Sequence, residues 1–276
     1  MKSACVAVLI ALPVFCQEPS GKGVNFYSIE REIRIGQQIG ADLERTIPIV
    51  HVPKLDAYVS KLGAALAGHA DGRFPYHFVI YEDRGFPAAP LVVLGMPQDP
   101  FLGQPVEPVA VCGGPVFVPI SLLANAESEA EFAFQLAHAI AHVSLRQATR
   151  EATREEVVNL AMIPVGAARV PNVAAHVEWG IELGFVASIR SFERQADIVA
   201  TSILSEAGYD PEAMIRVLER QAALGIGATG KVFATHPAPE RRIETIATRL
   251  TDLPLRGYVT TSTQFAQMKA LASSLF

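Results

Sequence analysis

The sequence predicts an α+β protein that is mostly helical with a small β-sheet, and three observations support this class. Several segments repeat apolar residues at spacings of three and four, the pattern of helices that bury one face. Residues 76–81 (YHFVIY) are rich in aromatic and β-branched residues and predict a strand. Hydrophobic residues make up 50% of the chain, and a single domain of about 260 residues can bury one substantial core.

Two helices and two strands are expected before residue 120. Residues 28–45 and 54–67 each predict an amphipathic helix; the inward positions are Ile29, Ile33, Ile39 and Leu43 in the first, and Leu55, Val59, Leu62 and Leu66 in the second. After the strand at 76–81, residues 86–108 are dense in Pro and Gly and predict a loop, with at most a short strand at 91–94. The segment 116–118 (VFV) predicts a strand that leads toward the next helices.

The stretch Ser128 to Arg150 predicts one long helix around which the chain is organised. Ser128 and Glu131 stand three apart and form a capping box, in which each side chain binds a backbone amide at the helix start. Apolar residues then recur at helical spacing and predict a buried stripe: Phe132, Leu136, Ile140 and Val143.

Four further helical regions are expected after residue 150. Residues 157–189 are apolar but broken by Pro and Gly and predict a buried helical hairpin; a membrane-surface patch is the alternative, since no run reaches the roughly 20 apolar residues of a span. Residues 191–208 predict a second strong helix that Gly208 ends as a left-handed cap. A helix at 211–224, a flexible loop at 225–234 and a helix from about residue 239 complete the chain.

His138 and His142 stand four apart on the central helix. They therefore project from one face, with Cβ atoms about 5–6 Å apart, which lets two imidazoles bind one metal ion at about 2.0–2.1 Å. Such a pair is also found as two ordinary half-buried residues. The surrounding residues have the frame of the zinc-protease motif HExxH, but Ala139 stands in place of the glutamate. Glu193 and Asp197 lie one turn apart on the second helix, where a solvated face is the alternative interpretation.

Three segments together resemble the signatures of peptidase family M48, a group of gluzincin metallopeptidases. They are FAFQLAHAIAHVSLRQATR, FERQADIVATSILSEAGYDPEAM and THPAPERRI, and the family's usual forms are HEIAH, ERxAD with GYDPxAM, and HPxxxxRI. The resemblance extends from about residue 29 to the C-terminus. It implies a zincin-like (gluzincin) metallopeptidase domain over residues 17–276, with a small sheet beside the active-site cleft. The family includes prenyl-protein-processing, mitochondrial Oma-type and bacterial envelope-assembly metallopeptidases.

The resemblance also implies a site. One Zn²⁺ per chain is expected on His138, His142 and Glu193, with Asp197 holding a ligand histidine by its other ring nitrogen. His236 lies in the HP motif, where a fourth ligand, a donor to the reaction oxyanion and a structural turn residue are all open. The remaining histidines are expected to be structural: His51, His69, His77 and His176. In the family an edge strand beside the cleft binds substrate backbone by β-addition; a plain packing strand fits residues 116–118 equally well.

Ala139 is the one departure at a catalytic position. The family's glutamate takes the proton of the attacking water and passes it to the leaving amine, and such general acid–base catalysis contributes about 10²–10⁴-fold. We therefore expect hydrolysis to be crippled, whether Ala139 is a natural loss or an introduced change. Two functions stay open: an exported zinc metalloendopeptidase acting on envelope or unfolded polypeptides, or a non-catalytic zinc-binding pseudopeptidase acting as a chaperone-like or partner-binding module.

The N-terminus predicts export. Lys2 gives a positive start, and residues 4–15 form an apolar run too short for a span of about 20 residues. We expect residues 1–16 to be a signal peptide removed before Gln17, which places the mature chain in a periplasm. Phe15 fits poorly with lipid attachment at Cys16, and removal of the signal leaves Cys112 without an intrachain partner. The formal net charge of −5 provides no basic stripe for nucleic acid.

Overall fold

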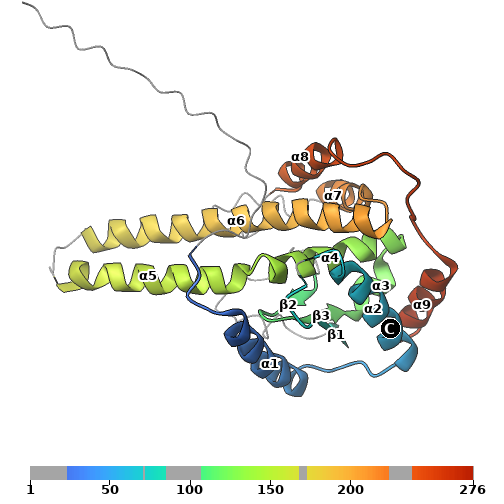
Figure 1. Ribbon diagram of the computed structural model, residues 1–276, viewed down its shortest axis with the longest axis horizontal. Helices are drawn as coiled ribbons and strands as arrows, with labels where there is room; N and C mark the ends of the chain where they lie inside the picture. The colour runs from blue at the N-terminus through green and yellow to red at the C-terminus, as the bar shows by residue number, and fades with distance from the viewer. Residues whose placement is uncertain (1–23, 71, 85–106, 168–172, 224–237, 276) are drawn as a thin grey trace, which may run out of the picture.

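The computed structural model describes residues 24–70, 72–84, 107–167, 173–223 and 238–275, and within 158–167 and 173–189 it describes the backbone alone. The predicted α+β class is confirmed, because helices surround one small sheet (Figure 1). The helices are α1 (Ile29–Thr46), α2 (Pro53–Ala67), α3 (Ile120–Asn125), α4 (Glu129–Ser144), α5 (Gln147–Ala167), α6 (Val173–Ala207), α7 (Ala213–Ala223), α8 (Pro239–Leu250) and α9 (Thr263–Ser273). The strands are β1 (His77–Tyr81), β2 (Val109–Ala110) and β3 (Pro115–Pro119).

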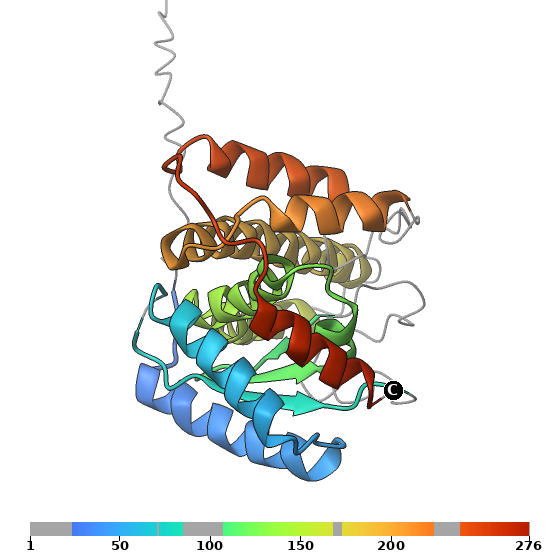
Figure 2. The ribbon, with the colours of Figure 1, turned by 90° about the vertical axis from the view of Figure 1, so that its right-hand side faces the viewer.

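The sheet has the order β1-β3-β2, with β1 parallel and β2 antiparallel to β3. The predicted strand at 116–118 is therefore the central one and packs between two partners. Within the described chain, β2 forms the sheet edge next to α4. The four predicted inward residues of α2 are all buried, and they join the main core with residues of β1 and β3. Figure 2 shows the layers: α7 and α8 lie above α6, and the sheet with α1 and α2 lies below.

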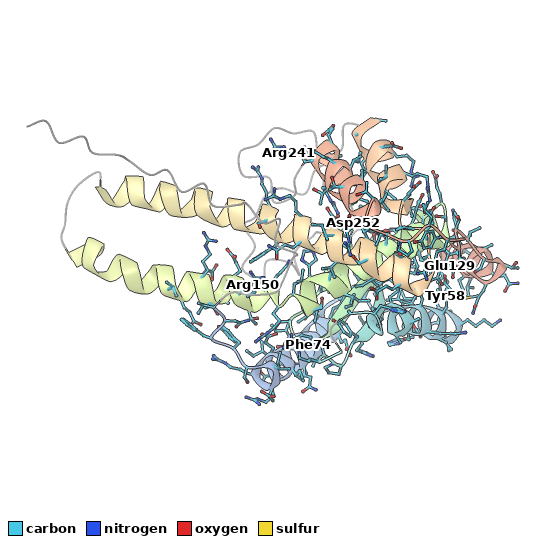
Figure 3. All side chains as sticks on the ribbon, turned by 45° about the horizontal axis from the view of Figure 1, so that its top comes forward. Tyr58, Phe74, Glu129, Arg150, Arg241 and Asp252 are labelled. Atoms are coloured by element: carbon cyan, nitrogen blue, oxygen red, sulfur yellow. The ribbon has the colours of Figure 1, made fainter. Side chains whose placement is uncertain are left out.

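α4 is the centre of the core. It packs against α2, α6 and α7, and nearly every one of its residues is buried, including the predicted stripe. Ser128 caps it as predicted by accepting the Glu131 amide at 3.2 Å. The Glu131 carboxylate, however, accepts the amide of Glu127 at 3.1 Å instead of the Ser128 amide. The Tyr58 hydroxyl of α2 donates to Glu129 at 2.9 Å and ties the start of the helix to α2 (Figure 3).

The prediction of one helix from 128 to 150 was wrong. α4 ends at Ser144, and α5 begins at Gln147. Between them Arg146 has φ of 58°, the left-handed region that L-residues rarely adopt. No glycine or proline stands at this break. The apolar spacing of a helix continues across it, so the sequence contains no sign that the helix ends there.

α5 and α6 form the predicted helical hairpin, and Figure 1 shows it projecting from the rest of the protein. The predicted start of the second helix at 191 was wrong, because α6 begins at Val173 and continues without interruption to Ala207. The side chains of 158–189, including His176, lie outside the described residues, so their burial stays a prediction. Among the helices of the described chain, none combines the length and apolarity needed to cross a bilayer.

In the C-terminal third, the predicted end of α6 and the predicted starts of α7 and α8 agree with the structure to within two residues. Gly208 has φ of 84°, and Tyr209 donates to the Leu204 carbonyl at 2.9 Å, which is the left-handed cap expected from its sequence. α7 begins two residues later than predicted, and α8 begins at Pro239 as predicted. No helix was predicted at α9, which Ser262 caps and which buries Phe265.

The buried face of α1 is not the predicted one. Of the four predicted inward residues only Leu43 is buried, while Glu32, Gly36 and Gly40 occupy the remaining inward positions. The reason is close approach of two backbones: a Cβ built on Gly36 would lie 1.8 Å from the Cys112 carbonyl oxygen. The spacing of apolar residues could not predict this face, because glycines, which have no side chain, lie against the neighbouring backbone.

We expect Gly36→Ala to destabilise the protein by roughly 2 kcal/mol, because a clash of about 3 kcal/mol outweighs a gain of about 1 kcal/mol in helix propensity. The free energy of unfolding in urea measures this. Gly257→Ala is the control, since nothing lies within 4 Å of the Cβ it would add, and it should stay within about 0.5 kcal/mol of the unaltered chain. Equal stability of the two variants would contradict the backbone contact.

Candidate metal centre

The structure brings His138 and His142 of α4 together with Glu193 of α6. The Nε2 atoms of the two histidines lie 2.9 Å apart. Glu193 Oε2 lies 3.3 Å from His138 Nε2, and its Oε1 lies 3.5 Å from His142 Nε2. Among the described residues these three form a group of side chains that could hold a metal ion.

The dimensions of this group fit zinc. Two ligand atoms at about 2.0–2.1 Å from a tetrahedral ion lie about 3.3 Å from each other, and the three observed separations bracket this value. The side chains of His138 and Glu193 are 3% and 8% exposed, whereas that of His142 is 25% exposed. The group is therefore closed on the side of His138 and open on the side of His142.

Polar contacts behind the two rings favour one tautomer of each ring. His138 Nδ1 lies 3.1 Å from Asp197 Oδ1, and His142 Nδ1 lies 2.5 Å from Gln147 Oε1. An oxygen beside each Nδ1 atom favours a proton there, and a neutral ring of that tautomer presents its Nε2 lone pair to the other ring. Two lone pairs 2.9 Å apart repel each other unless a cation lies between them. The chemistry of the donor set therefore fits a metal ion.

The pKa values of the two histidines shift in opposite directions. Burial alone would lower the pKa of His138, but the carboxylates of Asp197 and Glu193 raise this pKa to about 10. Burial lowers the pKa of His142, although Glu193 opposes this. These shifts favour a protonated His138 beside a neutral His142 when no metal is bound, and zinc binding would then displace the His138 proton.

A buried ion pair fixes Asp197 behind the site. Arg242 of α8 is 2% exposed, and its Nε and Nη2 donate to the two Asp197 oxygens at 2.9 and 2.8 Å. Burial would raise the pKa of Asp197, but Arg242 and His138 lower it. Arg242 also lies 3.4 Å from Glu107. The sequence analysis assigned no role to Arg242, although the HPxxxxRI signature contained it.

Ala139 offers no group for proton transfer. It is 1% exposed and belongs to the main hydrophobic core. Glu107, an acidic residue that no pattern in the sequence indicated, lies 3.4 Å from Arg242. Burial lowers the pKa of His142, and the charge of Glu107 offsets a small part of this lowering. No pattern in the sequence connects Glu107, which ends a Pro- and Gly-rich segment, to the central helix.

Other predicted residues lie apart or outside the description. His51, His69 and His77 are exposed on the surface, and His69 lies 3.5 Å from Glu206. His236 and residues 86–106 of the predicted loop lie outside the described residues. The role of His236 therefore stays a prediction.

The chain is similar to known proteins over the region that contains this group of residues. Residues 109–250 match the profile of Peptidase family M48, a stretch that contains both candidate histidines, Glu193 and Arg242. The beta-barrel assembly-enhancing protease of Yersinia pestis is 24% identical over 264 residues, which cover 88% of this chain and 49% of that protein. The protein of the same name from Escherichia coli (strain K12) is 23% identical over 78% of this chain and 43% of its own length.

A putative beta-barrel assembly-enhancing protease of Vibrio cholerae is 28% identical over 229 residues, again 78% of this chain and 43% of that protein. The chain thus spans about half the length of the curated relatives that it matches, or slightly less.

We expect the purified protein to carry about one zinc ion per chain, and His142→Ala to lose it, because two remaining ligands hold zinc weakly. Elemental analysis after dialysis measures the zinc content. His51→Ala is the control, since this exposed histidine lies outside the group. Equal zinc in the two variants would contradict the site.

Zinc binding at pH 7 should release about one proton per chain, because His138 with its raised pKa of about 10 is protonated in the metal-free site. Zinc affinity should accordingly rise with pH between 7 and that pKa, by up to about tenfold per unit. Calorimetric titrations in two buffers of different ionisation enthalpy give the number of protons. A value of zero would show that the histidine pair is neutral.

Proposed function

The chain belongs to Peptidase family M48, and from that premise we propose that it is an exported zinc-binding metallopeptidase domain that engages envelope or unfolded polypeptides and hydrolyses them poorly. One observation carries the proposal: His138, His142 and Glu193 converge into a group that could hold a metal ion, with polar oxygens beside the outer ring nitrogens. One Zn²⁺ per chain is the ion that this donor set and the family favour. When bound, zinc would supply Lewis acidity to the peptide carbonyl and to the attacking water.

Each side chain of the site would have a separate role. His138, His142 and Glu193 would hold the ion, while Asp197 keeps the proton of His138 on Nδ1. Position 139 follows His138 by one step, about 100° round the helix, where the family's glutamate accepts a proton from water. An alanine methyl group can accept none. The loss corresponds to about 3–5 kcal/mol of activation free energy, so hydrolysis should be slow.

The proposed class of substrate is inferred from the names of the relatives. Three of them are named for enhancing β-barrel assembly, which supports a polypeptide of the bacterial envelope as substrate or client. A periplasmic location would follow from cleavage of the predicted signal before Gln17, a segment outside the described residues. The β2 edge next to α4 supports binding of an extended substrate backbone by β-addition.

A second candidate function is a zinc-binding pseudopeptidase that holds polypeptides without cutting them. The burial of Ala139 in the main core favours it, because an active enzyme needs its base exposed to water at this position. The ligands and their supporting residues are otherwise intact. A domain that retains the metal group without the base suits binding better than hydrolysis.

Ala139→Glu should raise the cleavage of casein by about 10²–10⁴-fold without altering the zinc content, because the new carboxylate acts as a base and not as a ligand. Ala139→Gln, which has the same size but no basic group, is the matched control. Circular dichroism and zinc analysis of each variant show whether the buried position accepts the longer side chain.

Two results would contradict the proposal in different ways. Fast, chelator-sensitive cleavage by the unaltered chain would mean that another group acts as the base. No gain in a folded, zinc-loaded Ala139→Glu variant would favour the pseudopeptidase.

A further inference from the structure

Gln147, the first residue of α5, contacts both candidate ligand helices through one side chain. It is 3% exposed. Its Oε1 accepts the Nδ1 proton of His142 at 2.5 Å, and its Nε2 donates to the Phe192 carbonyl at 3.0 Å. Phe192 directly precedes Glu193, so this carbonyl belongs to the peptide unit that leads into the third ligand.

We infer that Gln147 is a positioning residue, which fixes the tautomer of His142 and the place of Glu193 together; the inference rests on the metal site proposed above. Its amide has one donor end and one acceptor end. The Phe192 carbonyl can only accept, so it turns the NH₂ group of Gln147 toward itself and the oxygen toward His142. That oxygen in turn keeps the His142 proton on Nδ1 and leaves Nε2 for the metal ion.

The break between α4 and α5 brings this amide into place. In a continuous helix, Gln147 would stand five residues after His142 and about 140° away round the axis, so it would face away from the ring. The left-handed conformation of Arg146 interrupts the helix, and across this break the Gln147 side chain contacts the His142 ring. Arg146 is held there by buried Glu32 of α1, which accepts its Nε proton at 2.7 Å.

The two ligand histidines therefore have different supports. Asp197 behind His138 is a charged acceptor that the buried Arg242 fixes. Gln147 behind His142 is a neutral acceptor that a backbone carbonyl fixes. A neutral acceptor adds no charge to the open side of the group, beside His142. The Gln147 side chain also joins α4 to α6 at the level of the candidate ligands.

Gln147→Leu removes both contacts and keeps a side chain of similar size. We expect the affinity for Zn²⁺, measured by competition with a chromophoric chelator, to fall about 10–100-fold. The visible absorption of the Co²⁺-substituted variant should also change in intensity, because His142 and Glu193 lose their fixed directions. A purely structural role for Gln147 would leave that spectrum unchanged.

Thr153→Val is the matched control. Thr153 is also buried on α5, and its hydroxyl bonds the Thr149 carbonyl and the Phe26 amide, but it contacts none of the three ligands. Its substitution should keep zinc affinity within about threefold of the unaltered chain. Gln147→Glu restores an acceptor for His142, and we expect it to bind Zn²⁺ at least tenfold more tightly than Gln147→Leu.

Three results would overturn the inference: unchanged affinity and spectrum in Gln147→Leu, an equal loss in Thr153→Val, or no recovery in Gln147→Glu. Failure of the unaltered chain to bind Zn²⁺ or Co²⁺ would instead overturn the metal site itself, and the role of Gln147 with it. The binding data of the unaltered chain therefore separate the two failures.

Discussion

Two imidazole nitrogens face each other across 2.9 Å, and much of the structure serves to keep them there. Left alone, rings with their lone pairs opposed would rotate apart or change tautomer. α4 fixes their spacing, Asp197 and Gln147 hold their outer nitrogens, and Glu193 approaches from α6. The site is thus poised for a cation, and this requirement accounts for buried polar groups that the core would otherwise exclude.

The polar groups around the site form two buried connections. One passes from Arg242 of α8 through Asp197 to His138. The other passes from Glu32 of α1 to Arg146 at the break after α4. Each charge is paired, as burial demands. These connections link the first and the eighth helix to the central one, so residues far apart in the sequence share in positioning one group of ligands.

The sequence predicted what depends on local patterns. Capping residues located the start of α4, Gly208 located the end of α6, and the spacing of His138 and His142 predicted their common face. Prediction failed where tertiary contacts overrule the local preference. The helix break at Arg146 depends on Glu32, a partner distant in the chain, and the buried face of α1 depends on a backbone that approaches Gly36. Gln147 and Arg242 were missed because they contact the side chains of the site from other helices, and no fixed spacing in the sequence relates such residues to the ligands.

The pairing of Glu32 with Arg146 joins residues separated by 114 positions, and this separation bears on the order of folding. Closing so long a loop is slow compared with forming α4 itself. Until α1 docks, Arg146 lacks its ion pair with Glu32, and we expect its unfavourable conformation to be less stable. His142 then lacks the contact with Gln147 at the start of α5, so we expect this part of the site to form late in folding, after the N-terminal helix has docked.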